Sequence, residues 1–474
     1  MAAGQESATA SRPNRRQRRE RERSVWTDNP GLDVVHAHAA GIDIGNTEHY
    51  VAIAPDKSAQ PVRRFGCFTN DLQELAKFLK SHGIRSVAMQ STGVYWIPLY
   101  DVLEEGGLEV YLVNARDTKN LPGRKSDVQE SQWLLKLHTY GLLRNSFRPD
   151  SEIRVLRTYW RQRGEHVHAA GDCVRRMQKA LTQMNLQLAN AISDIMGSTG
   201  QRILRAILAG ERDAEKLAAM CDRRIRASQE EIIASLTGNW REELLFALKQ
   251  EMDRYDFSQR QISECDQRIE RHLESLPARS PEATLAGAAS APPSRKKKAA
   301  GNSPAFALDA ELRRIAGVDF TRIEGINVLT AQTVISEVGL DMNRWKTEGH
   351  FASWLGLCPH NAVSGGKVLR RGTRKVVNRA ATAFRLAAST LYRSRSYLGA
   401  QFRRFRSRLG APKAITAMAH KLAVLFYRML RFGQEYVDRG QQFYEDRFRE
   451  QQISLLSKKA AQFGFSITPA VSQP

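Results

Sequence analysis

Residues 40–47 read Ala-Gly-Ile-Asp-Ile-Gly-Asn-Thr, a short apolar run that contains one aspartate and ends in turn-forming residues. The run predicts a buried strand over residues 40–44, and residues 45–47 predict a turn. A charge inside a buried strand is costly unless it meets a cation or strong hydrogen-bond donors. Asp43 is therefore the first candidate functional residue of the chain.

After residue 47, short apolar runs alternate with stretches of helical periodicity. Further strands are predicted at residues 49–54, 62–68, 86–89 and 108–113, and helices near 72–79, 95–105 and after Ser126. The predicted order is βββαβαβα. Three antiparallel strands followed by alternating units are typical of the ribonuclease-H-like (RuvC-like) fold. We therefore expect an α/β domain of this fold over residues 36–150.

Two more acidic residues begin the helix after Ser126. Asp127 and Glu130 are three residues apart, so they share one face of the first helical turn. Acidic side chains also favour a helix N-terminus for electrostatic reasons alone. Together with Asp43, however, they make a set of carboxylates of the kind that phosphoryl transfer uses to hold two hard cations. We expect Asp43, Asp127 and Glu130 to bind one or two Mg²⁺ ions.

Gln90 ends the strand that is expected beside Asp43, and it is a candidate fourth member of this site. Its amide offers only a neutral oxygen, which is a poor replacement for a carboxylate at magnesium. The alternative is a polar residue at a strand end. The pattern Asp-x-Gly-x-Thr at residues 43–47 also opens the phosphate loop of actin-like kinases, but no second glycine-rich phosphate loop follows in the sequence.

The charge of the chain points to a polyanionic partner. The 474 residues have a formal net charge of +22 and are 42% hydrophobic, so the excess of basic residues is far larger than solubility needs. Seven arginines lie between Arg12 and Arg23, and residues 1–35 have little that could form a core. We expect this segment to be a disordered basic arm, which either contacts nucleic acid or is a solvated tail.

The middle of the chain has the pattern of long helices. Apolar residues from Val174 to Ile195 alternate spacings of three and four, which predicts a coiled-coil seam, and residues 248–269 partly repeat it. Residues 151–275 are therefore predicted as a helical coiled-coil region, either a hairpin within one chain or a dimer interface. Ordinary core stripes of a helical bundle are the alternative. Residues 276–309 are rich in Ala, Ser, Pro and Gly and predict a flexible linker.

A second, mainly helical and basic domain is predicted over residues 310–440, followed by a tail at 441–474. Residues 361–432 contain seventeen lysines and arginines and no acidic residue, which favours contact with phosphates. Ser364 precedes Gly365 and Gly366, and glycines let a backbone approach a phosphate closely. A Ser-Gly-Gly turn is also common in loops. The candidate nucleic-acid-binding residues are Lys367, Arg370, Arg371, Arg374, Lys375 and Arg379.

Compartment and membrane signals are few. The five cysteines form no CxxC pair and no zinc-site spacing. No apolar run approaches the roughly 20 residues that span a bilayer, and no secretion signal is recognisable. We expect a cytoplasmic protein without a membrane partner, in bacteria and associated with the nucleoid.

At this point several blocks resemble a known family. The blocks are Gly41–Gly45, Ser91–Tyr95, Val113–Arg116 and Pro122–Asp127 in the first half, and Ile323–Gly325, Gly356–Pro359, Ser364–Gly366 and the basic helix after Thr373 in the second. In this order they resemble the DEDD transposases of the "one-ten" insertion-sequence family, especially its "eleven-eleven" branch. The resemblance covers residues 36–440.

The resemblance implies a RuvC-like catalytic domain, a coiled coil for oligomerisation as a dimer or tetramer, and a C-terminal transposase domain whose serine attacks DNA. Asp43 matches the first aspartate of the family pattern, Asp127 the third, and Ser364 the nucleophile. Two positions depart from it, since Gln90 replaces the usual glutamate and Glu130 an aspartate. The family also implies donor and target DNA as substrates and a structured guide RNA that pairs with both.

Three functions follow as hypotheses. The first is an active RNA-guided DNA recombinase of an insertion sequence. The second is a nucleic-acid-binding relic whose substituted carboxylates no longer cut DNA. The third, a junction-resolving nuclease of RuvC type, needs neither a serine nor a second domain, so the C-terminal half of the sequence argues against it.

Overall fold

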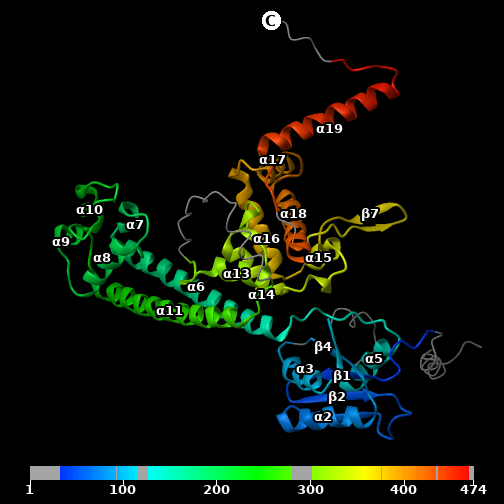
Figure 1. Ribbon diagram of the computed structural model, residues 1–474. Helices are drawn as coiled ribbons and strands as arrows, with labels where there is room; N and C mark the ends of the chain where they lie inside the picture. The colour runs from blue at the N-terminus through cyan, green and yellow to red at the C-terminus, as the bar shows by residue number, and fades with distance from the viewer. Residues whose placement is uncertain are drawn as a thin grey trace, which may run out of the picture. The chain divides into compact units, whose positions relative to one another are not determined.

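The computed structural model describes residues 32–91, 93–114, 126–279, 302–374, 376–433 and 436–468. Contacts between residues divide the chain after Arg148 into two units, one of residues 1–148 and one of residues 149–474. Figure 1 shows the first unit in blue to cyan and the second in cyan to red. Each unit has its own core and is described separately.

A five-stranded mixed sheet forms the centre of the first unit. Its strands are β1 (Ala39–Ile44), β2 (Glu48–Ile53), β3 (Val62–Gly66), β4 (Ser86–Gln90) and β5 (Glu109–Val113). They lie side by side in the order β3-β2-β1-β4-β5. The pairs β1–β2 and β2–β3 are antiparallel, whereas β1–β4 and β4–β5 are parallel. This arrangement agrees with the order predicted from the sequence.

Helices cover both faces of the sheet. They are α2 (Thr69–Ser81), α3 (Trp96–Glu105) and α5 (Asp127–Thr139). Alternate strand residues face opposite ways, so Ile42 and Met89 pack with α2 and α3 in the main apolar core, whereas Ala88 packs beneath Leu134 of α5. Gly41 lets α5 approach β1, because a Cβ at this position would overlap the helix backbone.

Two long antiparallel helices open the second unit, as Figure 1 shows. They are α6 (Ser151–Gln183) and α11 (Glu242–Ser275). The ring of His272 lies 2.8 Å from the carbonyl oxygen of Glu152, and near the opposite end Arg176 forms an ion pair with Glu251 at 3.3 Å. The two helices therefore pair within one chain; a dimer interface built from the same region stays a prediction.

The seam predicted from Val174 to Ile195 does not run along one helix. Helix α6 ends at Gln183, and Asn185 has a φ of 55°, the left-handed backbone that stops a helix. The chain then forms α7 (Leu188–Ala191), α8 (Ser198–Leu208), α9 (Ala214–Ala218) and α10 (Gln229–Leu236). Leu188 and Ile195 are buried in the apolar cluster that these short helices form with α6 and α11. For this part of the predicted seam, the structure therefore has the core of a helical bundle, which is the alternative to a coiled coil.

A helical body follows from Leu308 onwards. Its elements are α13 (Leu308–Ala316), η1 (Phe320–Arg322), α14 (Val328–Val338), η2 (Met342–Arg344), α15 (Glu348–Trp354), α16 (Arg379–Thr390), η3 (Leu391–Arg393), α17 (Tyr397–Leu409), α18 (Ala411–Phe432) and α19 (Gly440–Gln462). Its core contains buried aromatic rings, and those of Phe320 and Phe426 stack with centroids 4.1 Å apart. A hairpin of β6 (Ala362–Ser364) and β7 (Lys367–Arg370) projects from this body in Figure 1.

Of the predicted terminal and linking segments, the C-terminal one is largely described. Residues 1–31 of the expected basic arm and 280–301 of the expected linker lie outside the described residues. The segment from 441, expected as a tail, is mostly helix α19, which packs against α17. In the described ranges no helix is long and apolar enough to cross a membrane.

Candidate active site

Asp43 and Gln90 end two neighbouring parallel strands. Ile42 of β1 is in register with Met89 of β4, so the next residue of each strand lies at the same edge of the sheet and faces the same side. That side is the one covered by α5, because it is also the side of Gly41. The structure thus brings Gln90, which is buried, beside Asp43, which is half-buried, as the sequence predicts.

Helix α5 brings the other two acidic residues to this edge. Ser126 caps the helix, and its side chain accepts a hydrogen bond from the Gln129 amide at 3.4 Å. Asp127 and Glu130 therefore lie in the first turn, where the helix dipole stabilises negative charge. Asp127 is exposed and Glu130 is partly exposed. The helix passes over β1, so this turn lies close to Asp43.

The electrostatics of Asp43 show how close the three groups are. Burial, followed by the negative charges of Glu130 and Asp127, raises the pKa of Asp43 to about 6, against a weaker opposing effect of a hydrogen bond with the backbone of Ile44. None of the three carboxylates forms an ion pair with a described residue. Three acidic side chains therefore lie near one another without an ion-pair partner among the described residues.

The donor types fit a hard divalent cation, but the side chains do not converge on one point. Carboxylate oxygens are the ligands that Mg²⁺ takes in proteins. In the described part of the chain, no three His, Cys, Asp or Glu side chains lie close enough together to hold a metal. The residues thus have suitable chemistry, and ion binding requires that their side chains turn toward one another.

Two polar residues of β2 belong to the same face and are missed in the sequence analysis. Tyr50 pairs with Asp43 across the antiparallel strands, and its hydroxyl donates to Glu48 at 3.1 Å. This hydrogen bond, burial and the charge of Glu48 raise the pKa of Tyr50, and Asp127 contributes in the same direction. The alternation of Glu48 and Tyr50 in a strand paired with β1 is the signal that points to them.

Arg64 provides the positive charge at the edge of this group. It forms an ion pair with Glu48 at 3.1 Å and comes from β3, the next strand of the sheet. Glu48 is therefore a fourth carboxylate on the Asp43 face, and its charge is shared with an exposed arginine.

Ser364 lies at the tip of the β6–β7 hairpin, in the second unit. Ser364 pairs with Lys367, which leaves Gly365 and Gly366 as a two-residue loop with φ angles of 54° and 75°. Positive φ at both positions is typical of a type I′ turn, which favours glycine. The two glycines thus have a structural reason to be there, and the turn holds the Ser364 hydroxyl at an exposed position.

The predicted nucleic-acid-binding residues fall into three groups. Lys367, Arg370 and Arg371 are exposed on or beside the hairpin and have no ion pair with a described residue. Arg374 donates to the carbonyl oxygen of Ser353 at 2.5 Å, and Arg379 forms a hydrogen bond with Glu165 of α6 at 3.4 Å. Lys375 lies outside the described residues. Of the described residues in this set, Lys367, Arg370 and Arg371 are therefore the ones whose charges are most accessible to a phosphate.

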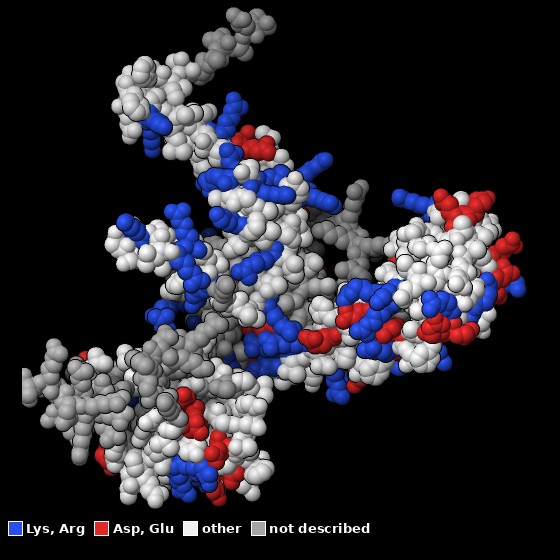
Figure 2. Space-filling model, turned by 180° about the vertical axis from the view of Figure 1, so that it is seen from behind, with Lys and Arg blue, Asp and Glu red and all other residues white. Residues whose placement is uncertain are grey.

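The surface charge agrees with the concentration of basic residues in the sequence. On the face seen in Figure 2, lysines and arginines gather over the C-terminal helices with few acidic side chains among them, whereas both signs alternate over the helical pair. A surface of one sign attracts a polyanion, because it raises the local concentration of the partner.

Comparison with protein families shows the class of protein to which the chain belongs. Residues 40–186 match the model of the DEDD transposases of IS110, and residues 319–403 match the model described as "Transposase IS116/IS110/IS902 family". No curated protein matches the sequence. The two matches include the carboxylate-bearing sheet and the serine hairpin, and they define the protein as a transposase with a ribonuclease-H-like domain.

The chain belongs to the IS110 family of DEDD transposases. It is thus a DNA transposase of an insertion sequence, and DNA is its substrate. Asp43, Gln90, Asp127 and Glu130 all lie within the first match, and Ser364 lies within the second.

Proposed function

We propose that this transposase cuts and rejoins DNA strands with two sets of residues, a magnesium-binding carboxylate group and the Ser364 hydroxyl. Asp43, Asp127 and Glu130 would hold one or two Mg²⁺ ions, which stabilise the charge that develops on a phosphate during transfer. The single observation that carries the proposal is the placement of Asp43 at the end of β1 beneath α5, whose first turn carries Asp127 and Glu130; the raised pKa of Asp43 agrees with it. A bound cation relieves the repulsion among the three carboxylates.

Ser364 is the proposed nucleophile. Its oxygen attacks the phosphorus, a serine–phosphodiester bond forms, and the deoxyribose oxygen of the cut strand leaves as a hydroxyl after it takes up a proton. An unactivated serine is a poor nucleophile, so its own proton must pass to a base, and the magnesium-bearing group of Asp43, Asp127 and Glu130 is proposed to assist this loss. Because the new bond is again a phosphodiester, a DNA hydroxyl can reverse the reaction without ATP. The exposed hairpin tip supports this role.

The exposed cations Lys367, Arg370 and Arg371 are proposed to bind the phosphates next to the scissile one. They lie on or directly beside the same hairpin as Ser364, so they are suited to fix the DNA backbone against its hydroxyl. A structured guide RNA encoded by the element is the proposed second polyanion. Residues 361–432, which contain seventeen basic residues and no acidic one, support binding of both, since each is recognised through its backbone.

A homo-oligomer is part of the proposal, because the carboxylates and Ser364 belong to different units of the chain. Groups from two protomers can then act on one phosphate. Mixing an Asp43→Asn protein with a Ser364→Ala protein tests this arrangement, since recovered cleavage requires complementation between chains.

A catalytically impaired relic is the second candidate, and two observations favour it. Gln90 places an amide where the family pattern has a carboxylate, and no described group of three acidic side chains converges as a metal site. Such a protein would still bind nucleic acid. Titration with Mg²⁺ during a strand-cleavage assay separates the two functions, because the relic cuts at no concentration.

The main experiment compares four proteins on one labelled DNA substrate. Ser364→Ala should abolish a protein–DNA adduct that survives denaturation and should abolish recombination. Asp43→Asn and Asp127→Asn should also abolish the adduct while they leave DNA affinity within about twofold, because the cationic surface is intact. Recombination by Ser364→Ala at the rate of the unchanged protein would disprove the serine mechanism and leave the family assignment untouched.

A further inference from the structure

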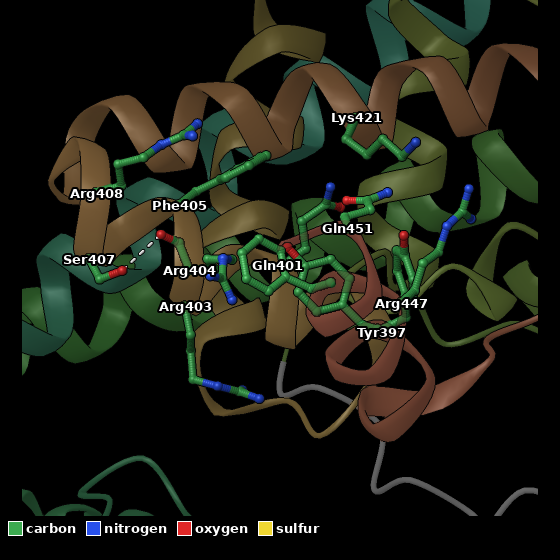
Figure 3. A pocket seen from close by; sticks show the side chains of 12 residues that line it. Tyr397, Gln401, Arg403, Arg404, Phe405, Ser407, Arg408, Lys421, Arg447 and Gln451 are labelled. Carbon is green, nitrogen blue, oxygen red and sulfur yellow. Dashed lines mark hydrogen bonds between the residues drawn. The ribbon is translucent and has the colours of Figure 1, made fainter. Parts of the chain in front are cut away.

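A basic groove lies between the last three helices of the second unit, apart from the hairpin. It has a volume of about 860 Å³ and is lined by side chains of α17, α18 and α19. Figure 3 shows Gln401 and Arg404 in its middle, Arg408 toward one end, and Lys421 and Arg447 toward the other. Most of these residues lie beyond residue 403, where the second family match ends.

The cations of this groove have no ion-pair partner among the residues that the structure describes. Arg404, Arg408, Lys421 and Arg447 have no ion pair with any described residue, and no acidic residue is among those that line the groove. Like charges held together repel one another. Four cations around one cavity, none of them in an ion pair with a described residue, therefore favour an anion with several charges.

Aromatic rings lie among these cations. The rings of Tyr397 and Tyr444 contact each other edge to face, with centroids 4.9 Å apart, and the guanidinium of Arg404 covers the ring of Phe448. Burial raises the pKa of Tyr444, while the charges of Arg404 and Arg408 lower it, so both guanidinium groups lie near its phenol. Aromatic and arginine planes together offer stacking surfaces for a base.

Gln401 adds a polar group that lacks a partner. Its Oε1 atom is buried and accepts no hydrogen bond from any described residue, and an unsatisfied buried acceptor is costly. A ligand with an N–H donor, such as the edge of a nucleobase, would supply the missing hydrogen bond. The groove therefore combines sites for phosphate, for a ring and for a donor.

The size of the groove decides between forms of nucleic acid. Pockets of roughly 300–1,000 Å³ enclose ligands of drug size, which corresponds to one or two nucleotides and excludes a double helix. We propose that this groove binds an unpaired nucleotide of a single-stranded nucleic-acid segment, with its phosphates against Arg404, Arg408 and Arg447 and its base against Tyr444. This site is separate from Ser364 and holds whether or not that serine is the nucleophile.

An acidic peptide is the competing ligand, since it too would meet the cations. It has no flat ring with N–H donors for Tyr444 and Gln401, so the observations favour the nucleotide. Poly-glutamate of similar charge provides the direct comparison.

The experiment measures binding of the full-length protein to a 12-nucleotide single strand that contains 2-aminopurine, and to the matching duplex. Arg404→Gln with Arg447→Gln should weaken single-strand binding at least tenfold and lower the salt slope by about 1.4, at about 0.7 per phosphate contact. Duplex binding should change less than threefold. Lys458→Gln with Lys459→Gln, which alters two exposed lysines of the same helix α19 outside the groove, should leave both unchanged.

Stacking gives the second readout. Base–aromatic stacking stabilises each bound base, so Tyr444→Ala should weaken single-strand binding about tenfold and abolish the quenching of 2-aminopurine. Tyr444→Phe should keep the single-strand affinity and the quenching. Equal losses for single strand and duplex, unchanged binding by the arginine pair, or competition by poly-glutamate as strong as by the unlabelled strand would each overturn the proposal. Melting curves of every variant check that the fold is intact, and the RNA version of the strand shows whether the groove distinguishes the sugar.

Discussion

Gly41 of β1 lies directly beneath the backbone of Leu135 in α5, so closely that a Cβ at position 41 would overlap the Leu135 amide nitrogen and the Ser131 carbonyl oxygen. The contact sets how near Asp127 and Glu130 come to Asp43. Backbone atoms cannot move aside as a flexible side chain can, so the helix itself must shift.

We therefore predict that Gly41→Ala destabilises the first unit by about 1–3 kcal/mol, the usual cost of overpacking, and abolishes DNA cleavage. Hydrogen exchange of residues 127–139 in the full-length protein measures the effect. Gly83→Ala is a useful comparison, because nothing lies within 4 Å of a Cβ at that exposed site and only its φ of 66° is strained. Normal cleavage by Gly41→Ala would contradict the close approach of α5.

Asp43 should destabilise the first unit when no cation is bound. A carboxyl whose pKa is raised by folding, here to about 6, makes the folded state lose stability as the pH rises from about 4 to 6. At pH 7.5 without divalent ions, Asp43→Asn should raise the free energy of unfolding by about 1–2 kcal/mol, which allows for solvent screening. Hydrogen exchange of β1 reports this change.

Magnesium should make the unchanged protein more stable than Asp43→Asn, the reverse of their order without divalent ions. It should stabilise the unchanged protein and have little effect on Asp43→Asn, because an amide is a weak ligand for this ion. Asp56→Asn, in an exposed turn away from the site, should respond to magnesium as the unchanged protein does. A destabilising effect of Asp43→Asn without cations would show that the carboxylates do not repel one another.

His138 should make the same unit sensitive to acid. Burial first and the adjacent His36 second lower the pKa of His138 to about 4, and its Nε2 lies 3.0 Å from the Ser86 hydroxyl oxygen. A histidine with a lowered folded pKa contributes stability above its unfolded pKa of about 6.5, and this stability is lost as the pH falls toward 4.

The full loss is roughly 2–3 kcal/mol. His138→Gln, which can still hydrogen-bond to Ser86, should flatten the dependence of unfolding on pH between 6.5 and 4. Urea unfolding followed by hydrogen exchange of α5 measures it. The same steep acid dependence in the variant would assign the effect to another group. His82→Gln, at the C-terminal cap of α2, provides the control.

The glycines of the serine hairpin allow a test that separates turn geometry from phosphate contact. Gly365 has a φ of 54° and no atom within 4 Å of an added Cβ, and asparagine adopts this backbone far more readily than valine. If the turn alone requires glycine, Gly365→Asn should keep at least about half of the adduct formation and Gly365→Val should lose most of it. Equal loss in both variants would indicate that the phosphate needs the space beside position 365.

The strands and helices of the first unit could be predicted because each has a recognisable pattern of apolar residues within its own sequence. Residues 40–44 and 86–89 are short apolar runs, and the helix near 72–79 has one apolar face, so local pattern and tertiary burial agree. The parallel pairing of β1 and β4 follows from the fold, so Asp43 and Gln90 lie side by side as expected. Helix α5 brings Asp127 and Glu130 to the same edge of the sheet, although the described acidic side chains do not converge on one point.

Other features depend on contacts that periodicity does not contain. The spacing from Val174 to Ile195 continues past the end of α6, because the short helices after Asn185 bury apolar residues at similar intervals. Helix α19 has no fully buried residue, so its sequence has no apolar face to indicate that it packs on α17. Glu48 becomes a candidate only once its strand is paired with Asp43.

The last prediction concerns the carboxylate that Gln90 lacks. Glu48 lies on the same face of the sheet as Asp43, in the paired strand β2, and accepts a hydrogen bond from Tyr50, which lies opposite Asp43. Its partner Arg64 comes from an exposed part of β3. We expect Glu48 to contribute negative charge to the magnesium site in place of the usual glutamate. Glu48→Gln should then weaken magnesium binding about tenfold, measured by calorimetry of the DNA-free protein, and raise the magnesium concentration for half-maximal cleavage.

Gln90→Glu should strengthen magnesium binding. In the double variant it should restore the magnesium affinity that Glu48→Gln removes, because a glutamate at position 90 then supplies the missing negative charge. The double-mutant cycle measures this compensation directly. Arg64→Gln controls for the ion pair, and by freeing Glu48 it should leave magnesium binding equal or stronger. If Glu48→Gln leaves the affinity for magnesium unchanged while Gln90→Glu raises it, Glu48 lies outside the site, and the amide at position 90 leaves the protein with three carboxylates.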